Sequence, residues 1–195
     1  MAASSVELVN EALAVLGAEP ITTLTAEDSP TAATALTLYQ PTLDRLLAEF
    51  PWRFATKRLV LSQDAETPPD PWSYQYTLPA ATIRVIRTDQ DVENFDLYRD
   101  DSDGTRKLYS NRSAVTADVV VSITDPGLLP AHFEEALVAR LAERLAMPVT
   151  RRVDFWQVLK ADALRAVSRA KTQDWNEAPA RTFEDGDVLA HARYR

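Results

Sequence analysis

The sequence predicts an α+β fold: a four-helix bundle with an inserted small antiparallel β domain and an extended C-terminal tail. Apolar residues recur with helical spacing over 1–51 and again over 126–175. Between these segments, over 52–125, they alternate with period two, whereas 176–195 follow neither period. Two helices before the insertion and two after it can pack antiparallel as one bundle.

The first helix is expected to begin after Ser4. Ser4 and Glu7 have the spacing of a capping box, in which each side chain bonds a backbone N–H that the helix leaves unpaired. Gly17 suits the left-handed position that follows a helix, and Pro20 prevents its continuation. The predicted apolar face consists of Val6, Val9, Ala12, Leu13 and Leu16.

The second helix has clearer end signals. Ser29 is a good N-cap and Pro30 fits the first helical position, where its missing N–H costs nothing. Pro41 lies inside the helix and is expected to kink or split it, and Pro51 ends it. The predicted apolar stripe consists of Ala32, Leu36, Tyr39, Leu43, Leu46 and Phe50.

The period-two region predicts a β domain with its own core, since it holds half of the aromatic side chains. A first strand over 54–61 is expected to place Trp52 and Phe54 on one face. The residues at 100–104, Asp-Asp-Ser-Asp-Gly, have the chemistry of a hairpin turn. Further strands are predicted over 72–78, 83–87, 95–98, 107–109 and 115–123.

Two more helices follow the β domain. Pro130 fits the first position of the third helix, Pro148 is expected to break it, and Thr150 can cap the next one. The third helix carries an apolar ladder at Phe133, Leu137, Leu141 and Leu145. The fourth, over 151–174, has its main stripe at Val153, Trp156, Leu159, Ala163, Leu164, Val167 and Ala170.

Phe155 and Val158 lie more than a quarter-turn from that stripe. A helix that is apolar on two sides is expected to be buried on two sides. The second side is covered either by the β domain or by another subunit. Phe155 and Val158 are therefore candidate subunit-interface residues.

The charge balance excludes several classes of function. The net charge is −8, and residues 1–150 carry 22 acidic and 12 basic side chains. This balance argues against a protein that neutralises nucleic-acid phosphates. The absence of cysteine excludes disulfides and thiolate sites. No apolar run approaches the ~20 residues of a membrane span, and Met1 to Ser5 lack the features of a signal peptide, so we expect cytoplasmic synthesis.

No catalytic, cofactor-binding or metal-binding constellation is expected. The Ser168–Lys171 spacing lacks the partner motifs of an acyl-transfer enzyme, and the four glycines cannot form a phosphate-binding loop. His132 is expected to be a surface or capping residue. Seven acids and one base between 89 and 103 predict a solvated acidic loop rather than a cation site. Its candidates for facing a partner or a channel are Asp89, Asp91, Glu93, Asp100, Asp101 and Asp103.

Several segments, taken in order, resemble one family. The most specific is Phe-Pro-Trp-Arg-Phe-Ala-Thr-Lys-Arg at 50–58. The others lie at 8–13, 16–21, 39, 46–47, 72–76, 78–79, 83–85, 133–137, 139–142 and 145–150. Together they resemble the head-to-tail adaptor, or connector, proteins of tailed bacteriophages, in particular the tail tubular protein A family of short-tailed phages.

The resemblance implies a structural virion protein at the head–tail junction, made in the host cytoplasm. Such proteins assemble as a ring, usually of twelve copies, that joins the portal to the tail nozzle and extends the DNA channel. DNA would pass through without sequence-specific binding. The C-terminal segment of the family typically reaches the portal, which implies docking by Phe183, Val188, Leu189 and Tyr194. Two alternatives stay open: a peptidoglycan-degrading tail hydrolase, and a head-completion plug.

Overall fold

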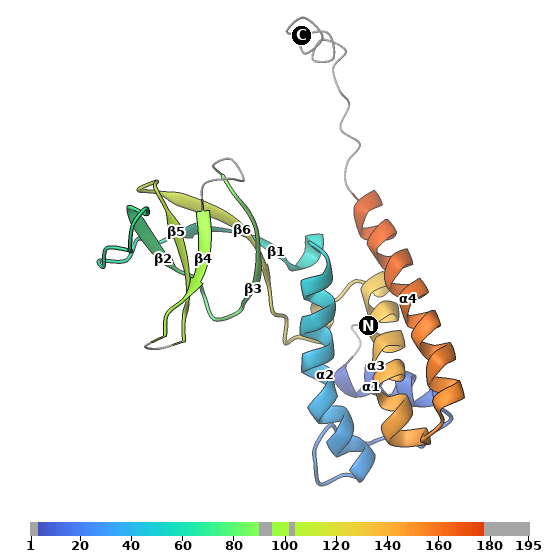
Figure 1. Ribbon diagram of the computed structural model, residues 1–195. Coiled ribbons are helices and arrows are strands. Elements are labelled where there is room, and N and C mark those ends of the chain that lie inside the picture. The colour runs from blue at the N-terminus through green and yellow to red at the C-terminus, as the bar shows by residue number, and fades with distance from the viewer. Residues whose placement is uncertain (1–3, 90–94, 102–103, 178–195) are drawn as a thin grey trace, which may run out of the picture.

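The protein has an α+β fold, seen in a computed structural model that describes residues 4–89, 95–101 and 104–177 (Figure 1). The described residues form four α-helices and two three-stranded antiparallel sheets. The helices are α1 (Ser5–Val15), α2 (Pro30–Glu49), α3 (Ala131–Thr150) and α4 (Val153–Asn176). The strands are β1 (Thr56–Leu61), β2 (Tyr74–Thr77), β3 (Thr82–Thr88), β4 (Phe95–Arg99), β5 (Arg106–Ser110) and β6 (Val115–Val121). Two short 3₁₀ helices are η1 (Arg53–Ala55) and η2 (Pro126–Leu128).

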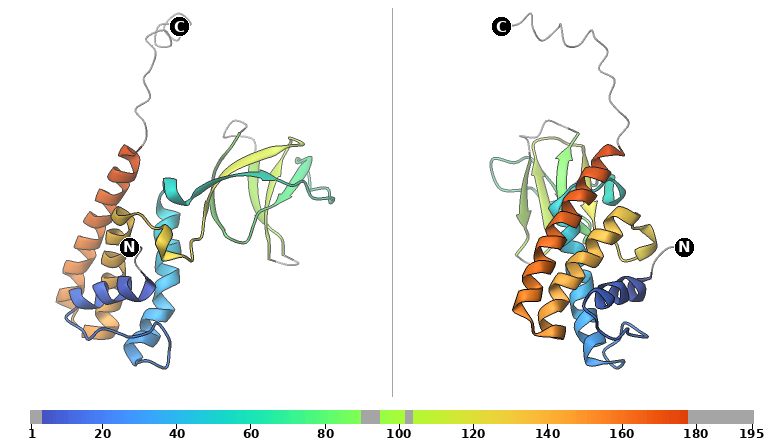
Figure 2. Two further views of the ribbon diagram at one scale, coloured as in Figure 1. Left: turned by 180° about the vertical axis from the view of Figure 1, so that it is seen from behind. Right: turned by 90° about the vertical axis from the view of Figure 1, so that its right-hand side faces the viewer.

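The third helix, α3, is the centre of the helical part. It packs against α1, α2 and α4, as the views in Figure 2 show from two sides. The expected ladder on α3 is confirmed, because Phe133, Leu137, Leu141 and Leu145 are all completely buried. The other helices close one apolar core around this ladder.

The predicted helix starts of α1 and α2 are confirmed. The amide of Glu7 donates to the Ser4 hydroxyl at 3.2 Å, and the amide of Ser4 donates to the Glu7 carboxylate at 2.6 Å. In α2, the Ser29 hydroxyl accepts from the amide of Ala32 at 3.0 Å. Gly17 follows α1 with φ of 66°, the left-handed backbone that its position predicts.

One expectation about proline was wrong, because α3 continues through Pro148 to Thr150 instead of breaking there. α2 is not split at Pro41, which leaves a kink as the open part of that expectation. Pro148 lies in the last turn of α3. The backbone hydrogen bond that it removes is therefore close to the end of the helix, which stops two residues later. Arg151, with φ of 56°, ends α3, and Arg152 rather than Thr150 is the N-cap of α4.

Trp52 and Phe54 belong to the helical core rather than to a strand face. The chain forms η1 at this point, and the first strand begins only at Thr56. Trp52 is completely buried, and its ring lies edge-on to Phe133 with centroids 4.9 Å apart. Its Nε1–H donates to the carbonyl of Leu46 at 2.8 Å, one of the last four carbonyls of α2, which have no partner within the helix.

The two sheets have the strand orders β1-β6-β3 and β2-β5-β4, and every pair is antiparallel. A second apolar core lies between them, and it includes Tyr76, Leu108 and Val119. The expected hairpin is confirmed as the β4–β5 pair. Along β6 the side chains alternate between the two cores, because Val119 and Val121 belong to the β core and Val120 belongs to the helical core.

Polar contacts join α2 to the β1-β6-β3 sheet. The Gln40 amide nitrogen donates to the carbonyl of Ile123 at 3.2 Å, and the Ser122 hydroxyl donates to the Asp44 carboxylate at 2.7 Å. Arg84 on β3 donates to the carbonyl of Ala48 at 3.3 Å, close to the end of α2. These contacts hold the sheet against one side of the helices (Figure 1).

Candidate functional site

The outer side of α4 carries a row of exposed large apolar side chains. Val153, Leu164 and Trp175 are 54%, 54% and 66% exposed. They are spaced eleven residues apart, which is close to three turns of an α-helix, so they lie on the same side of it. Gln157, Ala161 and Ser168 are also exposed and fall on this side. We call these six residues the α4 stripe.

The α4 stripe corrects the predicted buried face of the last helix. Leu159, Ala163, Val167 and Ala170 are buried as expected. Val153 and Leu164 were expected beside them but point to solvent. The apolar residues predicted for the buried face occupy a wider arc of α4 than α3 can bury. Those at the margin of this arc are therefore left exposed to solvent.

The structure separates the two predicted interface residues. Phe155 is half-buried and packs against the helical core, with the Arg152 guanidinium 5.7 Å from its ring centre. Its placement away from the buried face was therefore wrong. Val158 is 56% exposed and lies away from the core, as expected. Whether either residue contacts another subunit stays a prediction.

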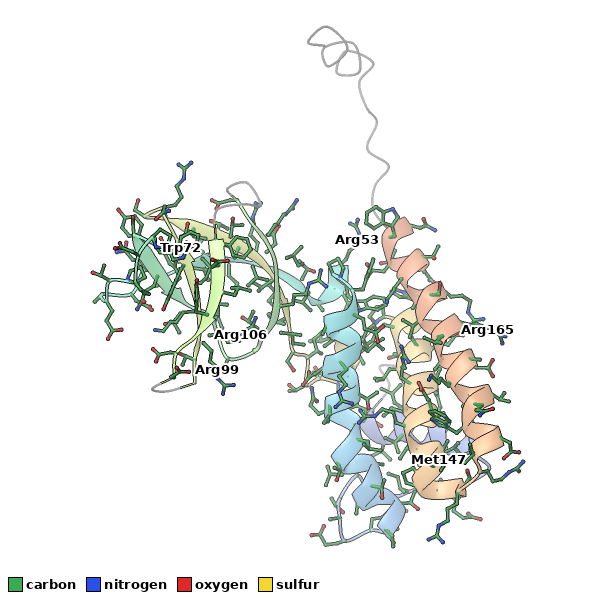
Figure 3. All side chains as sticks on the ribbon, viewed as in Figure 1. Arg53, Trp72, Arg99, Arg106, Met147 and Arg165 are labelled. Atoms are coloured by element: carbon green, nitrogen blue, oxygen red, sulfur yellow. The ribbon has the colours of Figure 1, made fainter. Side chains whose placement is uncertain are left out.

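Charged residues on α4 are mostly paired beside the stripe. Arg165 bonds Asp162 one turn earlier at 2.8 Å, and Arg169 reaches Glu135 on α3 at 2.8 Å. Arg165 projects from the outer side of α4 in Figure 3. Lys171, eighteen residues after Val153, and the exposed Lys160 fall in the same arc of α4, so the apolar side chains of the stripe alternate with polar residues and two lysines and are bordered by ion pairs.

Trp175 forms one wall of a hollow between the helices and the β domain. The hollow has a volume of about 410 Å³, and its walls include Phe50, Pro51, Ile86 and Arg53. The first three residues come from the end of α2 and from β3, so this surface spans the junction of the two parts. Figure 3 shows Arg53 beside the last turn of α4.

A buried polar contact lies behind this hollow, and the sequence did not predict it. His132 is 7% exposed and Asp174 only 1%, so the expectation of a surface or capping histidine was wrong. The His132 Nε2 atom lies 3.9 Å from the Asp174 carboxylate, too far for a hydrogen bond, and has no hydrogen-bond partner within the described part of the chain. His132 Nδ1 lies 3.6 Å from the Glu177 carboxylate.

Burial raises the pKa of Asp174, and nearby Glu177 raises it further. The Arg53 backbone N–H and His132 act in the opposite direction without reversing the shift. No sequence signal could have found this cluster, because its members come from three separate segments of the chain.

The described residues of the acidic loop do not form one patch. Asp89 follows β3 and exchanges backbone and side-chain bonds with Thr116 on β6. Asp100 and Asp101 follow β4, whose end lies at the opposite edge of the β domain in Figure 1. Asp91, Glu93 and Asp103 lie outside the described residues. The same is true of the expected portal-docking residues, Phe183, Val188, Leu189 and Tyr194.

Within residues 4–89, 95–101 and 104–177, no group of three or more His, Asp or Glu side chains is placed to hold a metal ion. In the same residues, no helix is both long and apolar enough to span a membrane. The sequence matches no protein-family model and has no significant match among curated proteins.

Proposed function

We propose that this chain is a structural virion protein that forms the adaptor ring between portal and tail nozzle in a short-tailed phage. The observation that carries the proposal is the α4 stripe: three large apolar side chains, each more than half exposed, along one side of the last helix. Exposed large apolar side chains aligned on one side of a helix are a candidate surface for association between proteins. The motif resemblance supplies the nature of the assembly.

The architecture we propose has three parts. A four-helix bundle comprises 1–51 and 126–175, the β domain is 52–125, and 176–195 form an extended tail. The two separate apolar cores support the first two parts, because each has its own set of completely buried side chains. The tail would dock on the portal.

A ring requires two different surfaces on each subunit that fit one another and close through rotation. The α4 stripe would supply one of them, and Val158 lies about a third of a turn away from its large apolar side chains. Following the resemblance, the ring would contain twelve copies. The negative net charge would let DNA pass without adhering, because few phosphate contacts could form.

The test is the assembly of subunits that carry a charge in the stripe. Leu164→Glu and Trp175→Glu place a carboxylate on an exposed helix position, so the monomer should keep its helix content and melting temperature. Arg165→Gln, which changes an exposed residue outside the stripe, is the matched control.

Each protein would be mixed with the purified portal and followed by sedimentation velocity. We expect the wild type and Arg165→Gln to form a ring-sized complex and the two stripe variants to remain monomeric. Normal assembly of both stripe variants would show that α4 is not the contact between subunits.

A further inference from the structure

A hollow between α2 and α3 is lined by more arginine than glutamate side chains. Its volume is about 270 Å³, and Arg45, Arg140 and Arg144 contribute to its walls with Glu49 and Glu143. It lies on the helical part and is distinct from the α4 stripe. No step of the adaptor proposal uses it.

Both glutamates are already engaged. Arg140 bonds Glu49 at 3.1 Å and Glu143 at 3.0 Å. Lys171 on α4 reaches the second carboxylate oxygen of Glu49 at 3.2 Å. These contacts form a compact network of two acids and two bases, in which Arg45 and Arg144 have no ion pair of their own within the described chain, although Glu143 is close enough to attract Arg144.

Arg144 is held in place by a neutral group. Its guanidinium donates to the Thr42 hydroxyl at 2.6 Å, and that hydroxyl itself donates to the carbonyl of Leu38. Burial lowers the pKa of Arg144, the positive charge of Arg45 lowers it further, and the negative charge of Glu143 acts in the opposite direction without reversing the shift. Among the described residues, neither arginine forms an ion pair with a carboxylate. Two arginines without an ion pair thus face the same hollow, an arrangement that a bound anion would stabilise.

We propose that Arg45 and Arg144 bind an acidic side chain of a protein partner in this hollow. The planar guanidinium groups present paired N–H donors that match the two oxygens of a carboxylate. A DNA backbone fits less well, because a duplex brings about one charge per 1.7 Å of its axis. Glu49 and Glu143 beside the hollow would repel the neighbouring phosphates, whereas a single carboxylate meets mainly the two arginines.

The test uses three probes. The capped peptide Ac-Ala-Ala-Glu-Ala-Ala-NH₂ carries one carboxylate, its glutamine counterpart carries none, and the dinucleotide dTpdT carries one phosphate. Binding would be followed by NMR through the arginine Nε–Hε signals at constant ionic strength. We expect the glutamate peptide to shift the Arg45 and Arg144 signals saturably, with a Kd on the order of 10 mM.

The variants are Arg45→Gln and the matched control Arg165→Gln. Arg45 is exposed, so Arg45→Gln should remain folded, which circular dichroism would verify. Arg45→Gln should raise the Kd of the glutamate peptide at least about 5-fold, because one charge-assisted contact is lost. Arg165→Gln should leave this Kd unchanged.

Several results would overturn the proposal. One is the absence of saturation below about 100 mM, far weaker than a two-arginine site should bind. Equal binding of the glutamine peptide, or an unchanged Kd in Arg45→Gln, would also overturn it. Tighter binding of dTpdT would show that the hollow prefers phosphate to carboxylate.

Discussion

The backbone N–H of Arg53 donates to both carboxylate oxygens of Asp174, at 3.2 and 3.3 Å, across 121 residues of sequence. This contact ties the start of the β insertion to the last turn of α4. Asp174 is 1% exposed, so its charge is held away from water. Arg53 and Asp174 both belong to the walls of the hollow that Trp175 lines.

Asp174→Asn should stabilise the protein at neutral pH. The amide keeps an oxygen for Arg53 and can donate to the unpaired Nε2 of His132, while the buried charge disappears. We expect the free energy of unfolding at pH 7 to rise by about 1 kcal/mol. Urea denaturation measures it, with exposed Asp162→Asn as the control. A loss of stability would show that the charge itself holds α4 in place.

The stability gained by Asp174→Asn should depend on pH and be smaller at acid pH than at neutral pH. The raised pKa means that the folded state holds the Asp174 proton more tightly than the unfolded chain. The contribution of Asp174 to stability therefore falls as the pH rises from the ordinary carboxyl range through the raised value. The advantage of Asp174→Asn should shrink towards about pH 4, where the carboxyl becomes protonated.

Asp64→Asn should destabilise the protein at neutral pH, in contrast to Asp174→Asn. Burial alone would raise the pKa of Asp64, but bonds from Lys107 and Thr77 outweigh it and lower the pKa. Lys107 Nζ lies 2.8 Å from this carboxylate, and both side chains are largely buried. We expect a loss of about 1–3 kcal/mol at pH 7.

The stability that Asp64 supplies is present above its unfolded pKa of 3.8 and disappears as the pH falls through the lowered value. Denaturation at several pH values would measure this decline. Asp162→Asn, at an exposed ion pair on α4, is the control. A loss that stays constant down to acid pH would rule out the charge as its source.

Trp52→Phe should destabilise the helical core by about 1–2 kcal/mol, and Trp52→Ala by about 3–5 kcal/mol. The first change leaves the Leu46 carbonyl without its donor, and the second also opens a cavity beside Phe133. Thermal and urea unfolding would measure both. Equal losses from the two variants would show that the hydrogen bond, rather than packing, sets the cost.

Deleting 178–195 should leave the melting temperature unchanged, because α4 ends at Asn176 and the Glu177 contact to His132 is kept. If 178–195 carry the portal-docking residues, the truncated protein should no longer bind the portal. Differential scanning calorimetry and surface plasmon resonance measure the two effects. Unchanged portal affinity would exclude docking through this segment.

The sequence predicted the parts of the fold that depend on local chemistry. The Ser4–Glu7 box and the Ser29 cap follow from which backbone groups a helix start leaves unpaired, so short spacings were sufficient. Pro148 misled because its cost depends on its distance from the helix end, which no local pattern reports. Trp52 misled because alternating aromatic residues are compatible with a strand as well as with η1.

The candidate site was less predictable than the fold. Periodicity finds the apolar residues of α4, but only the position of α3 decides that Leu159 is buried and Leu164 is exposed. The arginine hollow and the Asp174 contact each join segments far apart in the chain. Such sites arise from tertiary packing and leave no spacing signal in a single sequence.

Electron microscopy of this protein mixed with a purified portal protein of a short-tailed phage tests the adaptor proposal most directly. The protein alone is the control, since the portal may be needed to template assembly. We expect a closed ring on the narrow end of the portal, with α4 at the contact between subunits. A folded protein that forms neither a ring nor a portal complex would contradict the adaptor proposal.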